Sequence, residues 1–188
     1  MNTLIVSESH RYDEKRQVVI YTNDDTTKPY NDILVKIDIY HARVFGWFFN
    51  VVDEMVKNGQ HPGDYIAIMV ALSYLEGVEQ FRKGKETPIG RSGEWFKDSA
   101  KRVFKDQSDN IIDRLWKETR CGLFHSGFPN GKIYLSHGRS KAIEVEKDEV
   151  GNDCIHINPK LFLNEISCDF NKYISDLKDL DPKLKTMN

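Results

Sequence analysis

From Asn31 onward, apolar residues recur at steps of three and four, and this periodicity constrains the fold more than any other feature of the chain. The apolar positions are Ile33, Leu34, Ile37, Tyr40, Val44, Phe45, Phe48, Val51, Val52 and Met55. Such spacing predicts one long amphipathic helix. Asn58 and Gly59 are typical helix stops, so the helix is expected to end there.

Further helical patterns follow, separated by short turn-rich segments. A second helix is predicted from Pro62, because Tyr65 to Leu75 is apolar on almost every side, as in a helix enclosed by neighbours. A third has the apolar set Trp95, Phe96, Ala100, Val103 and Phe104, and a fourth, capped by Ser108 or Asp109, has Ile111, Ile112, Leu115, Trp116, Thr119 and Leu123. Pro159 opens a last amphipathic helix. The predicted fold class is mainly α, an up-and-down bundle of four to five helices.

Strand-like patterns are expected in two places. Three short alternating or β-branched runs, at 132–135, 142–146 and 154–158, predict a small antiparallel β-meander at about 132–158, before the last helix. Residues 1–30 are mostly polar and contain one β-like run, Val18 to Tyr21, so they are interpreted as an N-terminal arm with at most one strand. Residues 31–188 are then expected to form a single helical domain.

Composition limits the class of protein. With 39% apolar and 30% charged residues the 188-residue chain is typical of a globular protein. The N-terminus lacks a signal peptide pattern and the longest apolar run is too short to span a bilayer, so no membrane association is expected. Cys121, Cys154 and Cys168 lack paired spacing, which favours reduced thiols and a cytoplasmic location.

The formal net charge of −2 argues against indiscriminate nucleic-acid binding, but the charge is unevenly distributed. Residues 82–105 carry eight basic and three acidic side chains. The candidate nucleic-acid-binding residues in this stretch are Arg82, Lys83, Lys97, Lys101 and Arg102. The alternative interpretation is a solvated helix face with interspersed salt bridges.

The segment from Trp116 to Gly127, WKETRCGLFHSG, carries the most specific chemical signal. An Arg, four residues and a His occur at the end of the fourth predicted helix, with a Gly shortly after. This pattern resembles the motif of the HEPN superfamily of helical, nucleic-acid-associated domains. The resemblance covers roughly residues 33–127 and leaves the predicted β-meander and last helix outside it.

The resemblance implies metal-independent cleavage of RNA, often by toxins or antiviral defence effectors, with two motif copies brought together in a homodimer. His125 would transfer protons at a ribose hydroxyl or the leaving oxygen, and Arg120 would stabilise the negative charge that develops on the phosphate. Glu76, Cys121 and Ser126 are the candidate supporting residues. No cofactor and no metal are expected.

Helix geometry sets a condition on this assignment. Five α-helical steps rotate a side chain by about 140°, so Arg120 and His125 do not share a face unless the helix loosens. Gly122 and the end at Ser126 and Gly127 are where loosening is expected. One motif also supplies only one His, whereas transphosphorylation needs an acid and a base, so a second chain would have to supply the other.

Other interpretations stay open. Arg120 can cap the helix and His125 can have a structural role only. The chain would then be a non-catalytic interaction module that binds a cognate protein partner in a defence or toxin-antitoxin system. Cys121 favours this alternative, because the family often has a polar residue such as Asn there. Glu76 can orient Arg120 or simply be an exposed glutamate. A zinc site assembled from Cys121, His125, His137, Cys154 and His156 is a third alternative, without the paired spacing of structural zinc sites.

Overall fold

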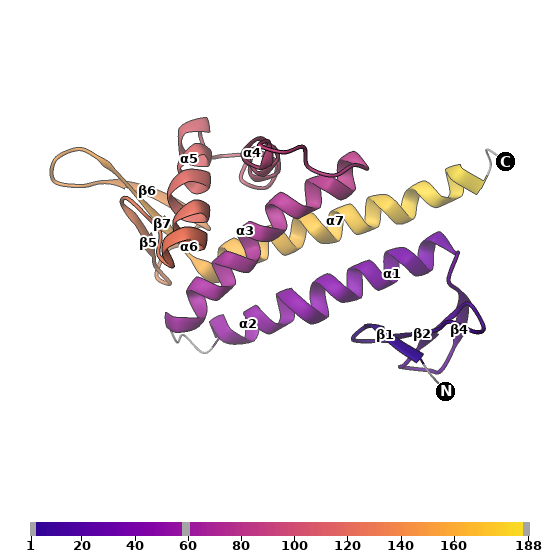
Figure 1. The fold of residues 1–188 in the computed structure, drawn as a ribbon. Coiled ribbons are helices and arrows are strands. Elements are labelled where there is room, and N and C mark those ends of the chain that lie inside the picture. The colour runs from indigo at the N-terminus through magenta and orange to yellow at the C-terminus, as the bar shows by residue number, and fades with distance from the viewer. Residues whose placement is uncertain (1–2, 58–60, 186–188) are drawn as a thin grey trace. The chain divides into compact units, whose positions relative to one another are not determined.

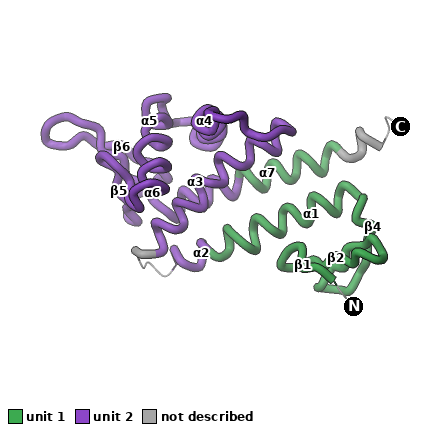
Figure 2. The backbone as a smooth tube through the Cα atoms, in the orientation of Figure 1, with its two compact units in different colours: residues 1–51, 169–188 green, residues 52–168 purple. Residues whose placement is uncertain are grey.

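The computed structural model describes residues 3–57 and 61–185 and shows an α+β fold (Figure 1). The expectation of a mainly α bundle with a β-meander only before the last helix is therefore wrong. The chain divides into two compact units, residues 1–51 with 169–188, and residues 52–168 (Figure 2). The single helical domain expected from residue 31 onward is distributed over both units.

The first unit begins with a four-stranded antiparallel meander whose strands pair in chain order. Its strands are β1 (Thr3–Ser7), β2 (His10–Asp13), β3 (Val18–Tyr21) and β4 (Thr27–Pro29). Only β3 was predicted, so the N-terminal arm with one strand is corrected to a sheet. Side-chain hydrogen bonds stabilise its turns, as where Asp13 accepts from the backbone N–H of Lys15 and Arg16 at 3.1 and 3.2 Å.

The long helix predicted from residue 31 is present, with one irregular turn. It consists of α1 (Ile33–Val44), the π-helical turn η1 (Phe45–Phe49) and α2 (Asn50–Lys57), whose first two residues belong to the first unit. Asp32 caps it by accepting from the N–H of Leu34 at 2.9 Å. In the first unit, α1 and the sheet share an apolar cluster formed by Val19, Val35 and Ile39.

The second unit contains the helices from α3 to α6, the second sheet, the rest of α2 and the first part of the last helix. Its helices are α3 (His61–Lys83), α4 (Ser92–Val103), α5 (Asp109–Arg114), the π-helical segment η2 (Leu115–Arg120) and α6 (Cys121–Ser126). Ser108 is the N-cap of α5, as predicted, and its hydroxyl accepts from the N–H of Ile111 at 3.4 Å. Leu72, Leu75, Phe96, Ile112 and Leu115 are fully buried.

The second sheet is mixed and not the antiparallel meander that was expected at 132–158. It contains β5 (Ile133–Leu135), β6 (Ile143–Lys147) and β7 (Asp153–Ile157), in the order β5-β7-β6. A tight turn makes β6 and β7 an antiparallel hairpin, whereas the longer segment after β5 lets that strand pair with β7 in parallel. Helix α7 (Pro159–Lys185) follows, beginning at the predicted Pro159.

Candidate functional site

The predicted Arg-x4-His motif lies on a helix that changes its hydrogen-bonding pattern just before it. In η2 the N–H of Cys121 donates to the carbonyl of Trp116, five residues back, so the turn is wider than an α-helical one. Beyond Arg120 the helix is α-helical until Gly127, which ends it in the left-handed conformation at φ 76°. The helix therefore widens before Arg120. The widening had been expected between Arg120 and His125. The two side chains remain about 140° apart around the helix.

Arg120 is held firmly at the surface of the second unit. Its Nη2 donates to Oε2 of Glu76 on α3 at 2.8 Å, and each of the two side chains is 21% exposed. The guanidinium also lies 4.9 Å from the ring centroid of Trp116 and 4.6 Å from that of Phe124, one turn before and after it. Glu76 is thus the residue that orients Arg120, one of the two interpretations left open by the sequence.

His125 and Ser126 lie in the last turn of α6, and both are exposed. Cys121 is half-buried and is a free thiol, as predicted. No hydrogen bond or ion pair reaches the imidazole of His125 from the residues that the structure describes. His125 is therefore free to meet a ligand or another chain, whereas Arg120 is already engaged.

The chain after the motif packs back on the helix, and this explains the glycine within it. A Cβ at Gly122 would lie 2.7 Å from the carbonyl oxygen of Phe128 and 2.8 Å from the amide nitrogen of Asn130. The N–H of Asn130 in turn donates to the carbonyl of Glu118 at 2.7 Å. Gly122 is thus required by close approach of this returning segment, which supports the end of the motif helix.

Two exposed aromatic side chains flank His125 in sequence. Phe124 is 43% exposed and Phe128 is 65% exposed. The ring of Phe128 contacts that of Tyr65 on α3 edge-on, with 5.9 Å between the centroids. Both rings therefore leave apolar area exposed in the segment from Phe124 to Phe128, which includes His125.

Six residues before Arg120, a second arginine is also fixed by a carboxylate. Arg114 donates from Nε and Nη2 to the two carboxylate oxygens of Glu118, at 2.8 and 2.7 Å. This hydrogen bonding raises the pKa of Arg114. The positive charge near the motif is therefore largely balanced by acidic side chains on the same unit.

The basic residues of α3 and α4 are paired in the same way. Lys83 bonds to Asp98 at 2.7 Å, and Lys101 bonds to Asp109 at 2.7 Å. Ion pairs also join Lys97 to Asp113 and Arg102 to Glu79. Arg82 is half-buried in the last turn of α3. The geometry thus favours the salt-bridged helix face over a dedicated anion-binding stripe.

The structure brings together a pair that the sequence did not suggest. Oδ2 of Asp64, in the first turn of α3, lies 2.7 Å from Nε2 of His137, which follows β5. The two residues are 73 positions apart, and only the tertiary fold places them in contact. Asp64 was not among the site residues predicted from the sequence. His137 was considered only as one ligand of a hypothetical zinc site.

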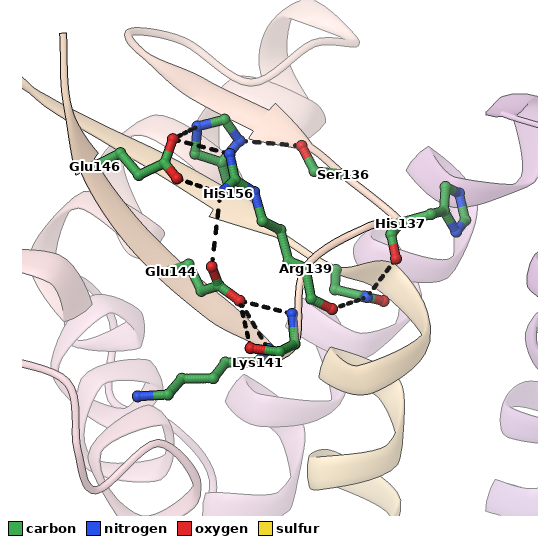
Figure 3. A network of polar contacts seen from close by, with 9 residues as sticks. Ser136, His137, Arg139, Lys141, Glu144, Glu146 and His156 are labelled. Atoms are coloured by element: carbon green, nitrogen blue, oxygen red, sulfur yellow. Dashed lines mark hydrogen bonds and ion pairs between the residues drawn. The ribbon is translucent and has the colours of Figure 1, made fainter.

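A polar network on the second sheet involves another histidine of that hypothetical zinc site (Figure 3). His156 Nδ1 lies 3.0 Å from the hydroxyl of Ser136, and its Nε2 lies 3.5 Å from Glu146, which is also paired with Arg139. This pairing with Arg139 lowers the pKa of Glu146. Among the described residues no group of three or more His, Cys, Asp or Glu side chains is arranged to hold a metal, so the proposed zinc ligands do not converge there.

Comparison with protein-family models gives no match. Searches against curated proteins and against solved structures find no significant similarity. No helix in residues 3–57 and 61–185 is long and apolar enough to cross a membrane.

Proposed function

We propose that this chain is a metal-independent endoribonuclease of HEPN type that acts as a homodimer, with Arg120 as phosphate clamp and His125 as proton-transfer group. The observation that carries the proposal is the fixed guanidinium of Arg120, held by Glu76 at 2.8 Å between two aromatic rings. A guanidinium has five N–H donors, so one hydrogen bond to Glu76 leaves others for a phosphate. A planar group in a fixed orientation is suited to bidentate phosphate binding.

The reaction would be attack of a ribose 2′-oxygen on the adjacent phosphorus, with loss of the 5′-oxygen of the next nucleotide. Negative charge increases on the non-bridging oxygens, and Arg120 stabilises it. His125, exposed at a helix end, transfers one of the protons. The exposed rings of Phe124 and Phe128 beside it support contact with a second copy of the chain at this end.

A second candidate function is a non-catalytic interaction module with a cognate protein partner. It is supported by the neutralisation of the basic residues, since Lys83, Lys101 and Arg102 are all engaged with carboxylates. Nucleic-acid affinity depends mainly on cations that are available to phosphates. A protein partner that binds the exposed aromatic surface needs no such cations.

Cleavage of RNA in the presence of EDTA tests the first proposal. His125→Ala and Arg120→Ala are compared with the parent protein and with Lys160→Ala, which removes an exposed charge elsewhere on the same unit. Circular dichroism first establishes that each variant is folded. We expect cleavage with the parent and Lys160→Ala, and loss of at least about 100-fold with His125→Ala. Equal cleavage by the parent and His125→Ala would remove His125 from the mechanism. Absence of cleavage by the parent, together with a stable partner, would favour the interaction module.

A further inference from the structure

We propose that the buried imidazole of His10 is a pH-sensitive switch in the first unit. While it is neutral it keeps the β1–β2 hairpin closed, and its protonation favours opening of the first sheet. The inference goes beyond the proposed RNA cleavage and is independent of it, because His10 lies in β2 of the first unit, whereas Arg120 and His125 belong to the second.

The first observation is that His10 is buried and hydrogen-bonded on one ring nitrogen only. The residue is 4% exposed, and its Nδ1 lies 2.7 Å from the hydroxyl of the equally buried Ser7 and 3.1 Å from that of Ser9. Its Nε2 is buried and has no hydrogen-bond partner among the residues that the structure describes. A neutral ring has one N–H, which a serine hydroxyl can accept from Nδ1, but an imidazolium has two. Protonation would therefore leave a buried, charged N–H without an acceptor.

The second observation concerns the groups that face the ring from the neighbouring elements. Tyr21 of β3, the cross-strand neighbour of His10, contacts it edge-on with 4.5 Å between the centroids. The hydroxyl of Tyr21 donates to Asp38 of α1 at 3.1 Å, and Asp38 also pairs with Lys178 of α7 at 2.8 Å. The carboxylate of Asp38 is thus engaged by other partners and not by His10. Lys28 of β4, 4.7 Å from the centroid of the Tyr21 ring, adds positive charge nearby.

These surroundings set the direction of the pH effect. Burial lowers the pKa of His10 from its ordinary 6.5, the charge of Asp38 raises it by less, and Lys28 lowers it further. An imidazole in the open, solvated hairpin titrates near its ordinary pKa of about 6.5. Neutral His10 therefore stabilises the closed sheet fully above about pH 6.5, and this stabilisation is lost as the pH falls toward the lowered pKa of the folded form.

Asp38 does not titrate in the same pH range. Burial raises the pKa of its carboxyl, but the hydrogen bond and the charge of Lys178 outweigh burial, so the pKa is lowered overall. Asp38 therefore stays ionised at pH 5, and a change of pH between 7.5 and 5 acts on the histidine and not on this ion pair.

The third observation is that the hairpin closed by His10 contacts the long helix of the same unit. Arg43 of α1 donates from Nε to the carbonyl oxygen of Val6 on β1. Glu8, the charged residue of the turn between β1 and β2, approaches η1 so closely that a Cβ at Gly46 would lie 2.9 Å from the Cβ of Glu8. Opening of the hairpin would therefore also release its contacts with α1 and η1.

Amide exchange followed by mass spectrometry at pH 7.5 and pH 5.0, corrected for the intrinsic pH dependence of exchange, tests the switch. If folded His10 stays neutral at pH 5.0, the equilibrium constant for opening should rise by up to about 30-fold, because only the open form takes up the proton. We expect this increase in peptides from β1, β2 and β3.

Two variants identify the group responsible. His10→Asn keeps a polar atom near the position of Nδ1 but does not titrate, so its exchange should show no such increase between the two pH values. His41→Asn makes the same change at the other histidine of the first unit and should behave like the parent.

Equal protection of the parent at the two pH values, or an increase that persists in His10→Asn, would overturn the inference. If His10→Asn does not fold, an NMR titration of the histidine resonances of the parent replaces it. A pKa of about 6.5 or higher for His10 then overturns the inference, and a lower pKa supports it. None of these measurements depends on RNA, so failure of the proposed cleavage and failure of the switch are separate outcomes.

Discussion

The ion pair between Glu76 and Arg120 should make a measurable contribution to stability, and a double-mutant cycle can isolate it. The changes are Glu76→Gln and Arg120→Gln, made singly and together. Glu76→Gln keeps the size of the side chain and removes only its charge, whereas Arg120→Gln also shortens the side chain, and the double variant of the cycle separates this loss from the charge interaction. We expect each single variant to be destabilised and the double variant to be less destabilised than the sum of the two.

The magnitude follows from the burial of the pair. Exposed pairs contribute about 0.2–1 kcal/mol, and removing one partner of a fully buried pair costs about 3–5 kcal/mol. With 2.8 Å between Nη2 and Oε2, and each side chain 21% exposed, the coupling should lie between these limits, at about 1–2 kcal/mol. Arg120→Gln should cost about 1 kcal/mol more than Glu76→Gln, because it also removes the contacts with the rings of Trp116 and Phe124.

Thermal and urea unfolding followed by circular dichroism provides the measurement. For a chain of 188 residues each kcal/mol corresponds to about 2–4 °C in Tm, so Glu76→Gln should melt about 2–8 °C lower. Glu86→Gln, at an exposed position in the loop after α3, is the matched control and should melt within about 1 °C of the parent. A coupling energy near zero, or equal effects of Glu76→Gln and Glu86→Gln, would refute the view that Glu76 holds Arg120.

Three further predictions concern the motif and the second sheet. Gly122→Ala should destabilise the protein by about 1–3 kcal/mol, because its Cβ would lie 2.7 Å from the carbonyl oxygen of Phe128, and urea unfolding measures this. Most basic side chains of α3 and α4 are already paired, so only about two of them should contact phosphates of single-stranded RNA. In a binding titration, the logarithm of the association constant should therefore fall with the logarithm of the salt concentration with a slope of about −1.4. The pairing of Arg139 with Glu146 lowers the pKa of the Glu146 carboxyl below its ordinary 4.5. The contribution of this pair to the stability of the second sheet is therefore complete above about pH 4.5 and is lost as the pH falls further. Amide-exchange protection of β7 should therefore decrease in acid, and less so in Arg139→Gln.

The helices were predictable because their signals are local. The three-and-four spacing of apolar residues from Asn31, the cap at Ser108 and the start at Pro159 each depend on residues that are close in sequence. The structure places helices at all three positions. The π-helical turns were not predicted, because an extra residue in one turn barely disturbs an apolar stripe.

The sheets were less predictable because strand pairing is not local. In the first unit, Leu4 and Ile5 are exposed and β2 contains two charged residues, so alternation between apolar and polar positions is weak there. In the second unit three strands were expected, but their order depends on whether β5 pairs with β6 or with β7, which no local pattern specifies. The contact of Asp64 with His137 depends on the same long-range arrangement.

The pairing of Arg120 with Glu76 affects how strongly the proposed RNA-cleaving site would bind its substrate before the reaction and in the transition state. A guanidinium and a carboxylate together carry no net charge, so the pair attracts the single negative charge of a phosphodiester only weakly. As the 2′-oxygen attacks, the phosphoryl oxygens gain charge, and the fixed N–H groups of Arg120 interact more strongly with them than with the ground state. Interactions that strengthen only in the transition state raise kcat and not affinity. Weak RNA binding is therefore compatible with cleavage at this site, and activity, more than affinity, is the quantity that distinguishes an endoribonuclease from an interaction module.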